Sequence, residues 1–484
     1  MSFMNYCRDG LFTDFYELTM AQGYFLQKRN EEVVFECFFR RQPFNGGFSV
    51  FAGIEPLIEA LEDFSFSSED IAYLKEQKIF DLSFLDYLSS WHFKGDLYSF
   101  DEGSLIFPQE PVIRICSNLI DAQIIEGLVL NTINFQSLIA TKSARVYIAS
   151  NRGKIMEFGL RRAQGADGAL SASRASYIGG VEGTSNALAG KIYGIPVMGT
   201  MAHSWVMSFP SEEEAFEAYA QIYPENSVFL IDTYDTIKSG IKNAIKAGSK
   251  LVNAGFNFGV RLDSGDIDYL SRQVRSELDK AGFPQAKIAV SNELTEDIID
   301  NLVKQGAPID NWGVGTNMVT GGSESSFSGV YKLSAKKDIN SGKWIPVMKF
   351  SDNPAKTTNP GLKNVYRLYD ENDMAIGDIL TLDDESIEAE KEYRFFHPMV
   401  DYRQFLCKAS KVKSLLKKKM SAGKAVESGM NQKEILEKSR KHFMEELDSL
   451  DPTYMRILNP HIYKVSLSEK LRNLKVKFIE ENLS

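Results

Sequence analysis

The chain is poor in cysteine and contains no long apolar segment. Its four cysteines, Cys7, Cys37, Cys116 and Cys407, lie far apart among 484 residues, and none belongs to a C-x-x-C pair. This spacing argues against a zinc ribbon and a disulfide framework, and it is typical of a reduced compartment. No window approaches the run of about 18 apolar residues that a membrane helix needs, and the N-terminal segment carries charges among its apolar residues. We therefore expect a cytoplasmic protein without a signal peptide or a membrane span.

The chain also lacks an excess of positive charge. Lysine and arginine number 55 and aspartate and glutamate 65, which gives a net charge of −10. Without a global positive field the sequence predicts no nucleic-acid or membrane partner, and an anionic ligand would need arginines gathered locally. A hydrophobic content of 43%, with 32 phenylalanines and 20 tyrosines, argues against disorder and indicates a globular protein long enough for several domains.

Histidine is scarce, and one of the five histidines has an unusual setting. The segment IPVMGTMAHSWVMSF places His203 close to Thr200 and Ser204, just after a short apolar run that resembles a strand. Such a histidine is either a buried structural residue or a group that takes part in chemistry. The segment by itself leaves both interpretations open.

The central part of the chain, residues 151–335, alternates between short apolar runs and stretches with helical periodicity. The apolar runs are KIMEFG, IPVMG, SVFLID, FGVRL, KIAVS and WGVG, and segments such as SEEEAFEAYAQIY and TEDIIDNLVKQG lie between them. This alternation predicts βαβ units and a parallel sheet. SYIGG and GVYKLS bring the expected number of strands to about eight, so we expect an α/β barrel, with an open doubly wound sheet as the alternative.

The remaining sequence divides into three parts. Residues 1–150 mix helical and strand patterns, as in TDFYELTMAQGYFLQ and VVFECFFR, and predict an N-terminal α/β domain. Residues 336–404 are rich in turns and strand-like runs, and we expect a β-rich segment that packs back on the N-terminal domain. Residues 405–484 are expected to form a C-terminal helical extension. Its lysine-rich run, KASKVKSLLKKKMSAGK, is interpreted as a solvated helix face or a flexible arm.

Polar side chains follow each of the six apolar runs of the central region. Because the carboxyl ends of parallel strands lie on one face of an α/β fold, these side chains are expected to converge there. Arginines in this set suit phosphate or carboxylate, and aspartates suit Mg²⁺. The set consists of Arg161, Arg162, Thr200, His203, Ser204, Asp232, Asp235, Arg261, Asp263, Ser264, Asp266, Ser291, Asn292, Glu293, Thr316, Asn317, Thr320, Gly321 and Gly322.

Two absences narrow the chemistry expected at this face. No lysine stands at these strand ends, which argues against a Schiff-base aldolase, and no G-x-x-x-x-G-K-[ST] motif is present, which argues against a P-loop ATPase. The stretch VGTNMVTGGSESS offers glycines and hydroxyls of the kind that hold a phosphate. Taken one at a time, these residues are also explained by structural ion pairs and turns, and only their convergence favours a site.

A series of motifs resembles the nicotinate phosphoribosyltransferase family of type II phosphoribosyltransferases. In order along the chain they are TDFYELTMAQGYF, EFGLRRAQG, GGVEGTSNALAG, GTMAHSWV, GVRLDSGD, VSNEL and GVGTNMVT. The resemblance runs from about residue 10 to 335, and LNPHIYKVSLS near the C-terminus resembles the same family. It implies an N-terminal α/β domain, an irregular α/β barrel and a homodimer with shared active sites.

The resemblance also implies a reaction. The family transfers the phosphoribosyl group of 5-phosphoribosyl 1-diphosphate to nicotinate, which releases diphosphate and forms nicotinate mononucleotide for NAD salvage. ATP is hydrolysed alongside, and Mg²⁺ neutralises the diphosphate. At the matching positions, His203 is the catalytic residue that ATP phosphorylates. Asp263 is a second catalytic residue, which holds the metal or the ribose hydroxyls.

The matching positions further imply a nicotinate site and a phosphate site. Tyr16 and Phe158 sandwich the nicotinate ring, with Tyr16 supplied by the other subunit. Arg261 receives the nicotinate carboxylate, and Thr200 binds nearby. The neutral Ser185 stands where nicotinamide-using relatives carry an aspartate, and it is compatible with an anionic base. The residues implied for phosphate and 5-phosphoribosyl 1-diphosphate are Arg161, Thr316, Thr320, Gly321 and Gly322.

Other functions stay open at this point. One alternative is a relative that uses nicotinamide or quinolinate, and the ATP-linked histidine motif argues against quinolinate. A second is a non-catalytic nucleotide-binding barrel, although His203 and Arg261, whose loss would mark such a protein, are both present. A third is a barrel aldolase or isomerase, which the absence of a lysine at the strand ends disfavours.

Overall fold

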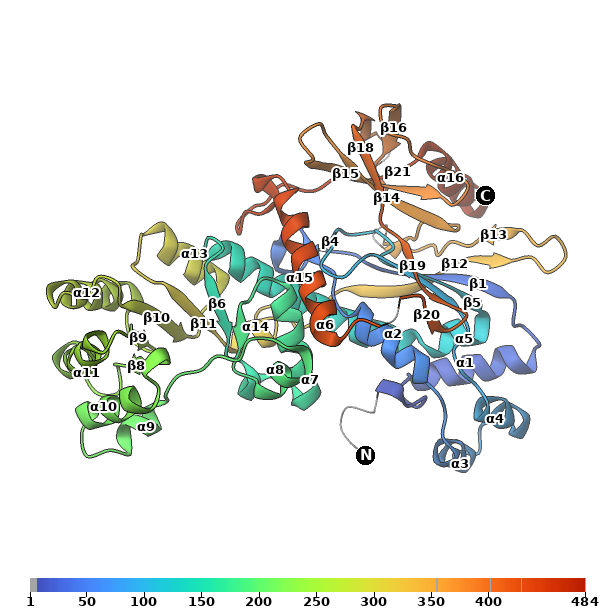
Figure 1. Cartoon of the computed structure of the whole chain (residues 1–484). Coiled ribbons are helices and arrows are strands. Elements are labelled where there is room, and N and C mark those ends of the chain that lie inside the picture. Colours follow the sequence, from blue (N-terminus) through green and yellow to red (C-terminus); the bar gives the residue numbers. More distant parts are fainter. Residues whose placement is uncertain (1–6, 354–355, 401, 428, 484) are drawn as a thin grey trace. The chain divides into compact units, whose positions relative to one another are not determined.

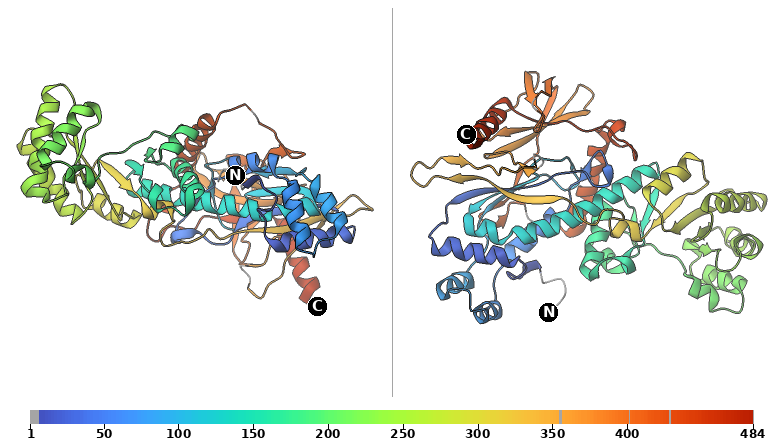
Figure 2. Two further views of the ribbon diagram at one scale, coloured as in Figure 1. Left: turned by 90° about the horizontal axis from the view of Figure 1, so that it is seen from below. Right: turned by 180° about the vertical axis from the view of Figure 1, so that it is seen from behind.

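The computed structural model describes residues 7–353, 356–400, 402–427 and 429–483. The chain forms two compact units, and each is described by itself. Unit 1 comprises residues 1–141 and 326–484, and unit 2 comprises residues 142–325. The boundary falls inside helix α6 (Glu126–Ala149), which Figure 2 shows as one unbroken helix.

Unit 2 is built on a parallel sheet with the strand order β7-β6-β11-β10-β9-β8. Each neighbouring pair is parallel, as the alternation of strands and helices in the sequence predicts. The central strands β9, β10 and β11 are almost fully buried, because helices flank them. The strands are β6 (Lys154–Glu157), β7 (Gly183–Thr184), β8 (Val228–Leu230), β9 (Gly259–Leu262), β10 (Lys287–Asn292) and β11 (Asn311–Val314).

The helices of unit 2 connect these strands (Figure 1). The α12 helix begins after Asp266, whose side chain accepts a hydrogen bond from the Tyr269 amide at 3.1 Å. The η5 turn, a π-helical turn, begins after Asp235 in the same way. The helices and helical turns are η3 (Leu160–Arg162), α7 (Gly165–Ile178), α8 (Ala187–Tyr193), α9 (His203–Met207), α10 (Glu212–Ile222), η4 (Pro224–Asn226), η5 (Thr236–Gly240), α11 (Ile241–Asn253), α12 (Ile267–Lys280), α13 (Glu296–Lys304) and α14 (Thr316–Val319).

Three strands expected in the central region are absent from this sheet. SYIGG begins in the last turn of α7 and continues into the turn that follows, because a short apolar run alone does not distinguish a buried helix from a strand. IPVMG forms only an isolated bridge between Val197 and Thr184. GVYKLS forms a strand of unit 1 instead. Within the described residues the sheet therefore has six strands, and the prediction of about eight is wrong, although the mixed α/β class is confirmed.

The first sheet of unit 1 is antiparallel and has the order β13-β12-β1-β5-β3-β19-β20. The segment VVFECFFR forms β1, whose residues are nearly all buried on both faces. Helix α5 packs on β1 and β5, and α1 packs on α5. Asp14 caps α1 in a capping box with Glu17. These elements are α1 (Phe15–Leu26), β1 (Glu32–Phe39), β3 (Asp96–Ser99), β5 (Ile113–Asn118), α5 (Leu119–Ile124), β12 (Gly329–Lys337), β13 (Trp344–Pro346), β19 (Lys417–Ser421) and β20 (Lys424–Ala425).

The second large sheet of unit 1 has the order β17-β16-β21-β15-β14-β18 and packs against α16. Its strands are β14 (Lys363–Tyr369), β15 (Ala375–Leu382), β16 (Glu392–Phe396), β17 (Gln404–Lys408), β18 (Lys411–Ser414) and β21 (Val465–Leu467), and α16 is Glu469–Leu483. The other elements of unit 1 are η2 (Pro43–Asn45), β2 (Ser49–Val50), α2 (Ile54–Asp63), α3 (Ser68–Glu76), α4 (Leu82–Ser89), β4 (Leu105–Ile106), α15 (Gln432–Asp448) and η7 (Pro452–Tyr454).

The lysine-rich run forms strands in place of the helix face or flexible arm expected from its composition. Strand β18 pairs with β14 in one sheet and β19 pairs with β3 in the other, so this run joins both large sheets of unit 1. Lys418 pairs with Asp96 at 2.7 Å, and Lys417 and Lys419 both pair with Asp101. The lysines are accommodated because carboxylates on the neighbouring segment face them.

None of the helices in the described ranges combines the length and the apolar character that crossing a membrane requires.

Candidate active site

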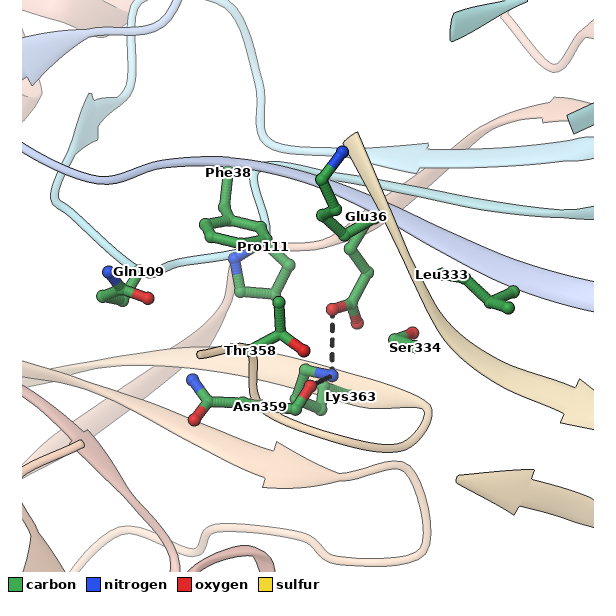
Figure 3. A pocket seen from close by; sticks show the side chains of 10 residues that line it. Glu36, Phe38, Gln109, Pro111, Leu333, Ser334, Thr358, Asn359 and Lys363 are labelled. Atoms are coloured by element: carbon green, nitrogen blue, oxygen red, sulfur yellow. Dashed lines mark hydrogen bonds and ion pairs between the residues drawn. The ribbon is translucent and has the colours of Figure 1, made fainter. Parts of the chain in front are cut away.

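A cavity in unit 1 is too small to hold a substrate (Figure 3). Its volume is about 10 Å³, which is room for a single water molecule. Within it the Lys363 ammonium pairs with Glu36 at 2.9 Å and donates to the carbonyl oxygens of Asn359 and Gly361 at 2.7 and 2.8 Å. Burial raises the pKa of Glu36 and lowers that of Lys363. This cluster is a buried structural ion pair, and most of the residues that the sequence predicts for a site belong to unit 2.

His203 lies at the first turn of α9, close to the carboxyl ends of β8 and β9. Its Nδ1 atom lies 3.1 Å from the Thr233 hydroxyl, within hydrogen-bond distance. Its Nε2 atom lies 3.7 Å from Asp263 Oδ2, which is beyond hydrogen-bond length. The His203 side chain is 40% exposed, so it is oriented on both sides of the ring yet open to a ligand.

Two aspartates and two serines hold the loop after β9 in place. The Asp263 amide and the Ser264 hydroxyl both donate to Asp232 Oδ2, at 2.9 and 2.6 Å. The Ser291 hydroxyl donates to Asp263 Oδ1 at 2.5 Å. Asp232 Oδ1 is buried and has no hydrogen-bond partner within the described part of the chain. This orphaned oxygen needs a ligand or a solvent molecule to be satisfied.

Arg261 projects from β9 beside Thr200. Its guanidinium donates to the Thr200 hydroxyl, and its Nε atom is buried with no partner among the described residues. Burial lowers the pKa of the Arg261 guanidinium, and the neighbouring Asp263 and Asp232 oppose that shift while Arg161 adds to it. A half-buried arginine with donors to spare suits a carboxylate or a phosphate oxygen.

Phe158 and Ser185 follow two neighbouring strands, β6 and β7. The Phe158 ring lies against Gly313 of β11, where a Cβ atom would come within 2.7 Å of the ring. The same Cβ would lie 3.2 Å from Ser291, so Phe158 reaches the strand end that carries the Asp263 contact. Ser185 is half-buried, and its amide donates to the carbonyl oxygen of Glu157 at 2.9 Å. The strand order thus puts Phe158 and Ser185 on the side of β6 and β7, with β11 and β10 between them and β9, which carries Arg261.

The glycine loop after β11 is held by its own hydroxyls. Thr316 Oγ1 donates to Glu293 at 3.2 Å, and Thr320 Oγ1 donates to the Thr316 carbonyl at 2.7 Å. Gly321 and Gly322 have φ values of 76° and 59°, a left-handed conformation that a larger residue rarely adopts. The conformation of this loop thus requires the two glycines.

Tyr16 lies on α1 in unit 1 and is 48% exposed. The other residues predicted for the site belong to unit 2. Burial, followed by the charge of Glu126, raises the pKa of the Tyr16 hydroxyl. Tyr16 is therefore a neutral, half-exposed aromatic side chain.

Some strand-end residues have structural roles, and other residues that matter were not predicted. Asp235 and Asp266 are helix caps, which use their carboxylates on backbone amides. Thr233 was missed, although it directly follows the apolar run SVFLID. Glu157 was missed because it lies inside the strand-like run KIMEFG and not after it.

The fold and the site together define a class. Unit 2 is the scaffold of an α/β enzyme that gathers a histidine, arginines and aspartates at the carboxyl edge of a parallel sheet.

Comparisons with known proteins identify the family within this class. The model described as nicotinate phosphoribosyltransferase (NAPRTase) N-terminal domain matches residues 11–134, and that of the nicotinate phosphoribosyltransferase C-terminal domain matches residues 362–475. A protein of Bacillus subtilis (strain 168) named nicotinate phosphoribosyltransferase is 40% identical over 473 residues, which cover 97% of this chain and 95% of the relative. The chain belongs to the nicotinate phosphoribosyltransferase family, and the resemblance found in its motifs is confirmed.

Solved structures agree with this assignment. The crystal structure of human nicotinic acid phosphoribosyltransferase superposes with a TM-score of 0.84 at 30% identity, covering 96% of this chain and 99% of the human one. A nicotinate-nucleotide pyrophosphorylase from Pyrococcus furiosus matches with a TM-score of 0.70 at 23% identity, covering 91% and 95% of the two chains. The second likeness shows a shared fold.

Proposed function

We propose that this protein transfers the phosphoribosyl group of 5-phosphoribosyl 1-diphosphate to nicotinate, forming nicotinate mononucleotide and diphosphate in NAD salvage. The observation that carries the proposal is Arg261, whose buried Nε atom lacks a partner among the described residues. Membership of the nicotinate phosphoribosyltransferase family supports the phosphoribosyl transfer as the reaction. A carboxylate-bearing ring satisfies that donor, because a guanidinium binds a carboxylate in a planar fork.

In this proposal the bound nicotinate is oriented more than it is activated. Phe158 stacks on the ring, Arg261 and Thr200 hold the carboxylate, and Tyr16 of the other subunit closes the second face. Bond cleavage at the ribose C1 atom produces an oxocarbenium-like centre, which the unprotonated ring nitrogen attacks. No general base is needed for this step, because the nitrogen already carries a free electron pair.

The phosphate groups of 5-phosphoribosyl 1-diphosphate are assigned to Arg161 and the glycine loop. Thr316, Thr320, Gly321 and Gly322 offer hydroxyls and backbone amides that suit phosphate oxygens. Asp263 and the orphaned Asp232 Oδ1 would hold Mg²⁺. No group of three or more metal-binding side chains occurs within the described residues, which fits an ion that the diphosphate carries. When bound, Mg²⁺ neutralises charge on the leaving diphosphate.

ATP is proposed to act through His203 and not through the transfer itself. The ring contacts Thr233 at Nδ1 and faces Asp263 at Nε2, so both nitrogens are oriented while the side chain stays open to a nucleotide. Phosphorylation of His203 would favour tight substrate binding, and its hydrolysis would drive product formation. His203 is thus the group through which ATP is coupled to the transfer.

The proposal extends to the architecture and the assembly of the protein. The six-stranded sheet of unit 2 is proposed to be an irregular α/β barrel, and α15 and α16 are proposed to form the C-terminal helical extension. Shared active sites require a homodimer, and α1 presents exposed side chains at Phe15, Tyr16 and Leu26 that suit contact with a second copy.

The buried thiol of Cys37 fits a reduced, cytoplasmic setting. No nucleic-acid or membrane partner is proposed.

A substrate test decides between nicotinate and its competitors. The protein is incubated with 5-phosphoribosyl 1-diphosphate, ATP and Mg²⁺, and mononucleotide formation is followed with nicotinate, nicotinamide or quinolinate as the acceptor. We expect rapid product formation with nicotinate only, since Ser185 carries no charge that repels it. Equal use of nicotinate and nicotinamide, or no product with nicotinate, would refute the proposal.

Two variants test the ATP and dimer assignments. His203→Ala is expected to abolish ATP hydrolysis and to leave slow transfer at high substrate concentration; hydrolysis at the wild-type rate would contradict the phosphohistidine role.

Mixing the Tyr16→Ala and His203→Ala proteins should restore activity toward about a quarter of the wild-type level if one subunit completes the site of the other. A mixture no more active than its components would contradict the shared site.

A further inference from the structure

Glu157, the last residue of β6, is fully buried and has no role in the chemistry described above. Both of its carboxylate oxygens accept hydrogen bonds. Oε1 accepts from the Gly159 amide, and Oε2 accepts from the hydroxyls of Ser173 and Thr184 at 2.9 and 2.5 Å. The three donors come from the turn after β6, from α7 and from β7, so one side chain connects three segments of unit 2.

The segments that Glu157 connects carry residues assigned to nicotinate. Phe158 directly follows Glu157, and its amide donates to the Val314 carbonyl at 2.8 Å, which fixes the strand end. The Ser185 amide donates to the main-chain oxygen of Glu157 at 2.9 Å. Phe158, proposed to stack on the ring, is therefore covalently bonded to Glu157. Ser185, proposed to select the base, is hydrogen-bonded to the main chain of Glu157.

A second layer of hydrogen bonds holds the backbone on both sides of Ser185. Thr184 Oγ1 accepts from the Asn186 amide at 3.0 Å, and the Asn186 side chain donates to Ser173 Oγ at 3.3 Å. Asn186 Oδ1 also caps α8 through the Ala189 amide at 3.2 Å. Ser185 thus lies between two residues that belong to the network of Glu157, and its backbone position depends on that network.

We propose that Glu157 is a positioning residue that sets the distance between Phe158 and Ser185 and thereby the recognition of the nicotinate carboxylate-bearing ring. This inference rests on the proposed function. Hydrogen bonds to a buried carboxylate are directional and costly to leave unmade, so truncation moves the turn after β6 and β7 together. Displacements on the scale of an ångström at a binding site have large effects on turnover.

The experiment compares Glu157→Ala, Glu157→Gln and Thr184→Val with a matched control, Glu212→Ala. Glu212 is a second buried carboxylate of unit 2, on α10, and it accepts from Asn243 on α11 at 2.9 Å. We expect Glu157→Ala to raise the KM for nicotinate about tenfold and to lower the preference for nicotinate over nicotinamide. The KM for 5-phosphoribosyl 1-diphosphate should rise by no more than about threefold, because Arg161 follows the turn that Glu157 holds, whereas the glycine loop has no hydrogen bond to the Glu157 side chain among the described residues.

The conservative and control variants separate positioning from general stability. Glu157→Gln should stay within about threefold of wild type, since its amide oxygen accepts from Gly159 and its NH₂ group donates to hydroxyls that rotate. Thr184→Val, which removes one donor, should raise the KM for nicotinate about threefold. Glu212→Ala should lower the thermal midpoint without changing the KM for nicotinate.

The outcomes distinguish this inference from the proposed function. Wild-type protein that makes no mononucleotide from nicotinate would overturn the proposed function and this inference with it. An active wild type, combined with an unchanged nicotinate KM in folded Glu157→Ala protein, would overturn the inference alone. If Glu157→Ala does not fold, Thr184→Val decides, and an unchanged nicotinate KM there would overturn the inference.

Discussion

Two strand arginines, one in each unit, illustrate how differently the two regions use charge. Arg367 of β14 in unit 1 is buried, and every guanidinium nitrogen has a partner: Asp378 at 2.9 Å and 2.7 Å, the Leu105 carbonyl at 2.8 Å, and Glu446. Burial by itself lowers the pKa of Arg367, and the two carboxylates raise it well above its ordinary value. Arg261 of β9 in unit 2 has Thr200 as a partner and a buried Nε atom without one in the described chain.

The two arginines differ in how completely their guanidinium groups are hydrogen-bonded. Carboxylates of the same unit already complete the bonding of Arg367, so this arginine holds the second sheet of unit 1 to α15. The donors of Arg261 are incomplete without an acceptor from outside the unit. A shifted pKa is common to both residues and so does not distinguish them; the unsatisfied Nε atom of Arg261 does.

The largest effect is expected on the structural side of this comparison. Arg367→Met leaves Asp378 buried without its cation and Glu446 still paired with Lys413, and it should cost about 3–5 kcal/mol of unfolding free energy. Urea unfolding of the variant measures this loss. A variant as stable as wild type would show that the ion pairs of Arg367 contribute little to the stability of the fold. Arg367 would then not be the structural counterpart of Arg261.

Glu17 tests whether an unsatisfied atom always marks a ligand site. It is buried in unit 1, its Oε2 atom accepts from Thr13 and from the Asp14 and Gly127 amides, and Oε1 has no partner within the described chain. Burial raises its pKa from 4.5 to about 7, with Thr13 opposing the shift and the charge of Glu126 adding to it.

The sign of the resulting pH dependence follows from this shift. Because the folded-state pKa of Glu17 is raised, its contribution to stability is fully present below about pH 4.5 and is lost as the pH rises through about 7. The loss amounts to about 3 kcal/mol at most. Unfolding free energies measured at about pH 5 and about pH 8 should therefore differ more in wild type than in Glu17→Gln. Equal differences in both proteins would show that Glu17 is ionised throughout.

A third substitution probes the functional side. Arg261→Met removes a half-buried charge whose donors are incomplete, so the unfolding free energy should stay within about 1 kcal/mol of wild type. The kcat/KM for nicotinate should fall about 100-fold, which corresponds to about 2.7 kcal/mol. Arg261→Lys serves as the control, because it keeps the charge without the planar fork. Full activity in Arg261→Met would remove this arginine from the site.

The smallest effect is expected from the lysine-rich strand. Lys418 pairs with Asp96 at 2.7 Å, and both side chains are more than 30% exposed. Lys418→Gln should lower the unfolding free energy by about 0.2–1 kcal/mol at low salt. The difference should shrink at about 1 M salt because the charges are screened. A loss that does not respond to salt would indicate packing of the lysine chain on Tyr98 as the main contribution.

Much of unit 2 was predictable from the sequence because its patterns are local. Strand runs such as KIAVS and helices such as TEDIIDNLVKQG lie where periodicity places them. The expectation that polar residues after the apolar runs converge on one face selected His203, Arg261 and Asp263. The structure brings these three residues together at one edge of the sheet. The roles given to them stay predictions until the assays above are done.

The errors arose where partners distant in the chain decide the structure. GVYKLS pairs with β1, from the other end of the sequence, and so forms part of unit 1. The lysine run became strands because Asp96 and Asp101 lie opposite it, which no local pattern shows. Asp235 and Asp266 resembled metal ligands by type and spacing, but backbone amides already occupy their carboxylates.

The sequence by itself determined the family, the alternation of strands and helices, and the set of polar residues at the strand ends, because motifs and periodicity are written in neighbouring residues. Only the tertiary structure decided which of those residues have bonds to spare. Whether Arg261 is complete, whether Asp232 has a free oxygen, and what Glu157 connects all depend on donors and acceptors from segments far apart in the chain. Hydrogen-bond satisfaction is a property of three-dimensional neighbours, and it distinguishes the fully bonded Arg367 from Arg261, which is proposed to bind substrate.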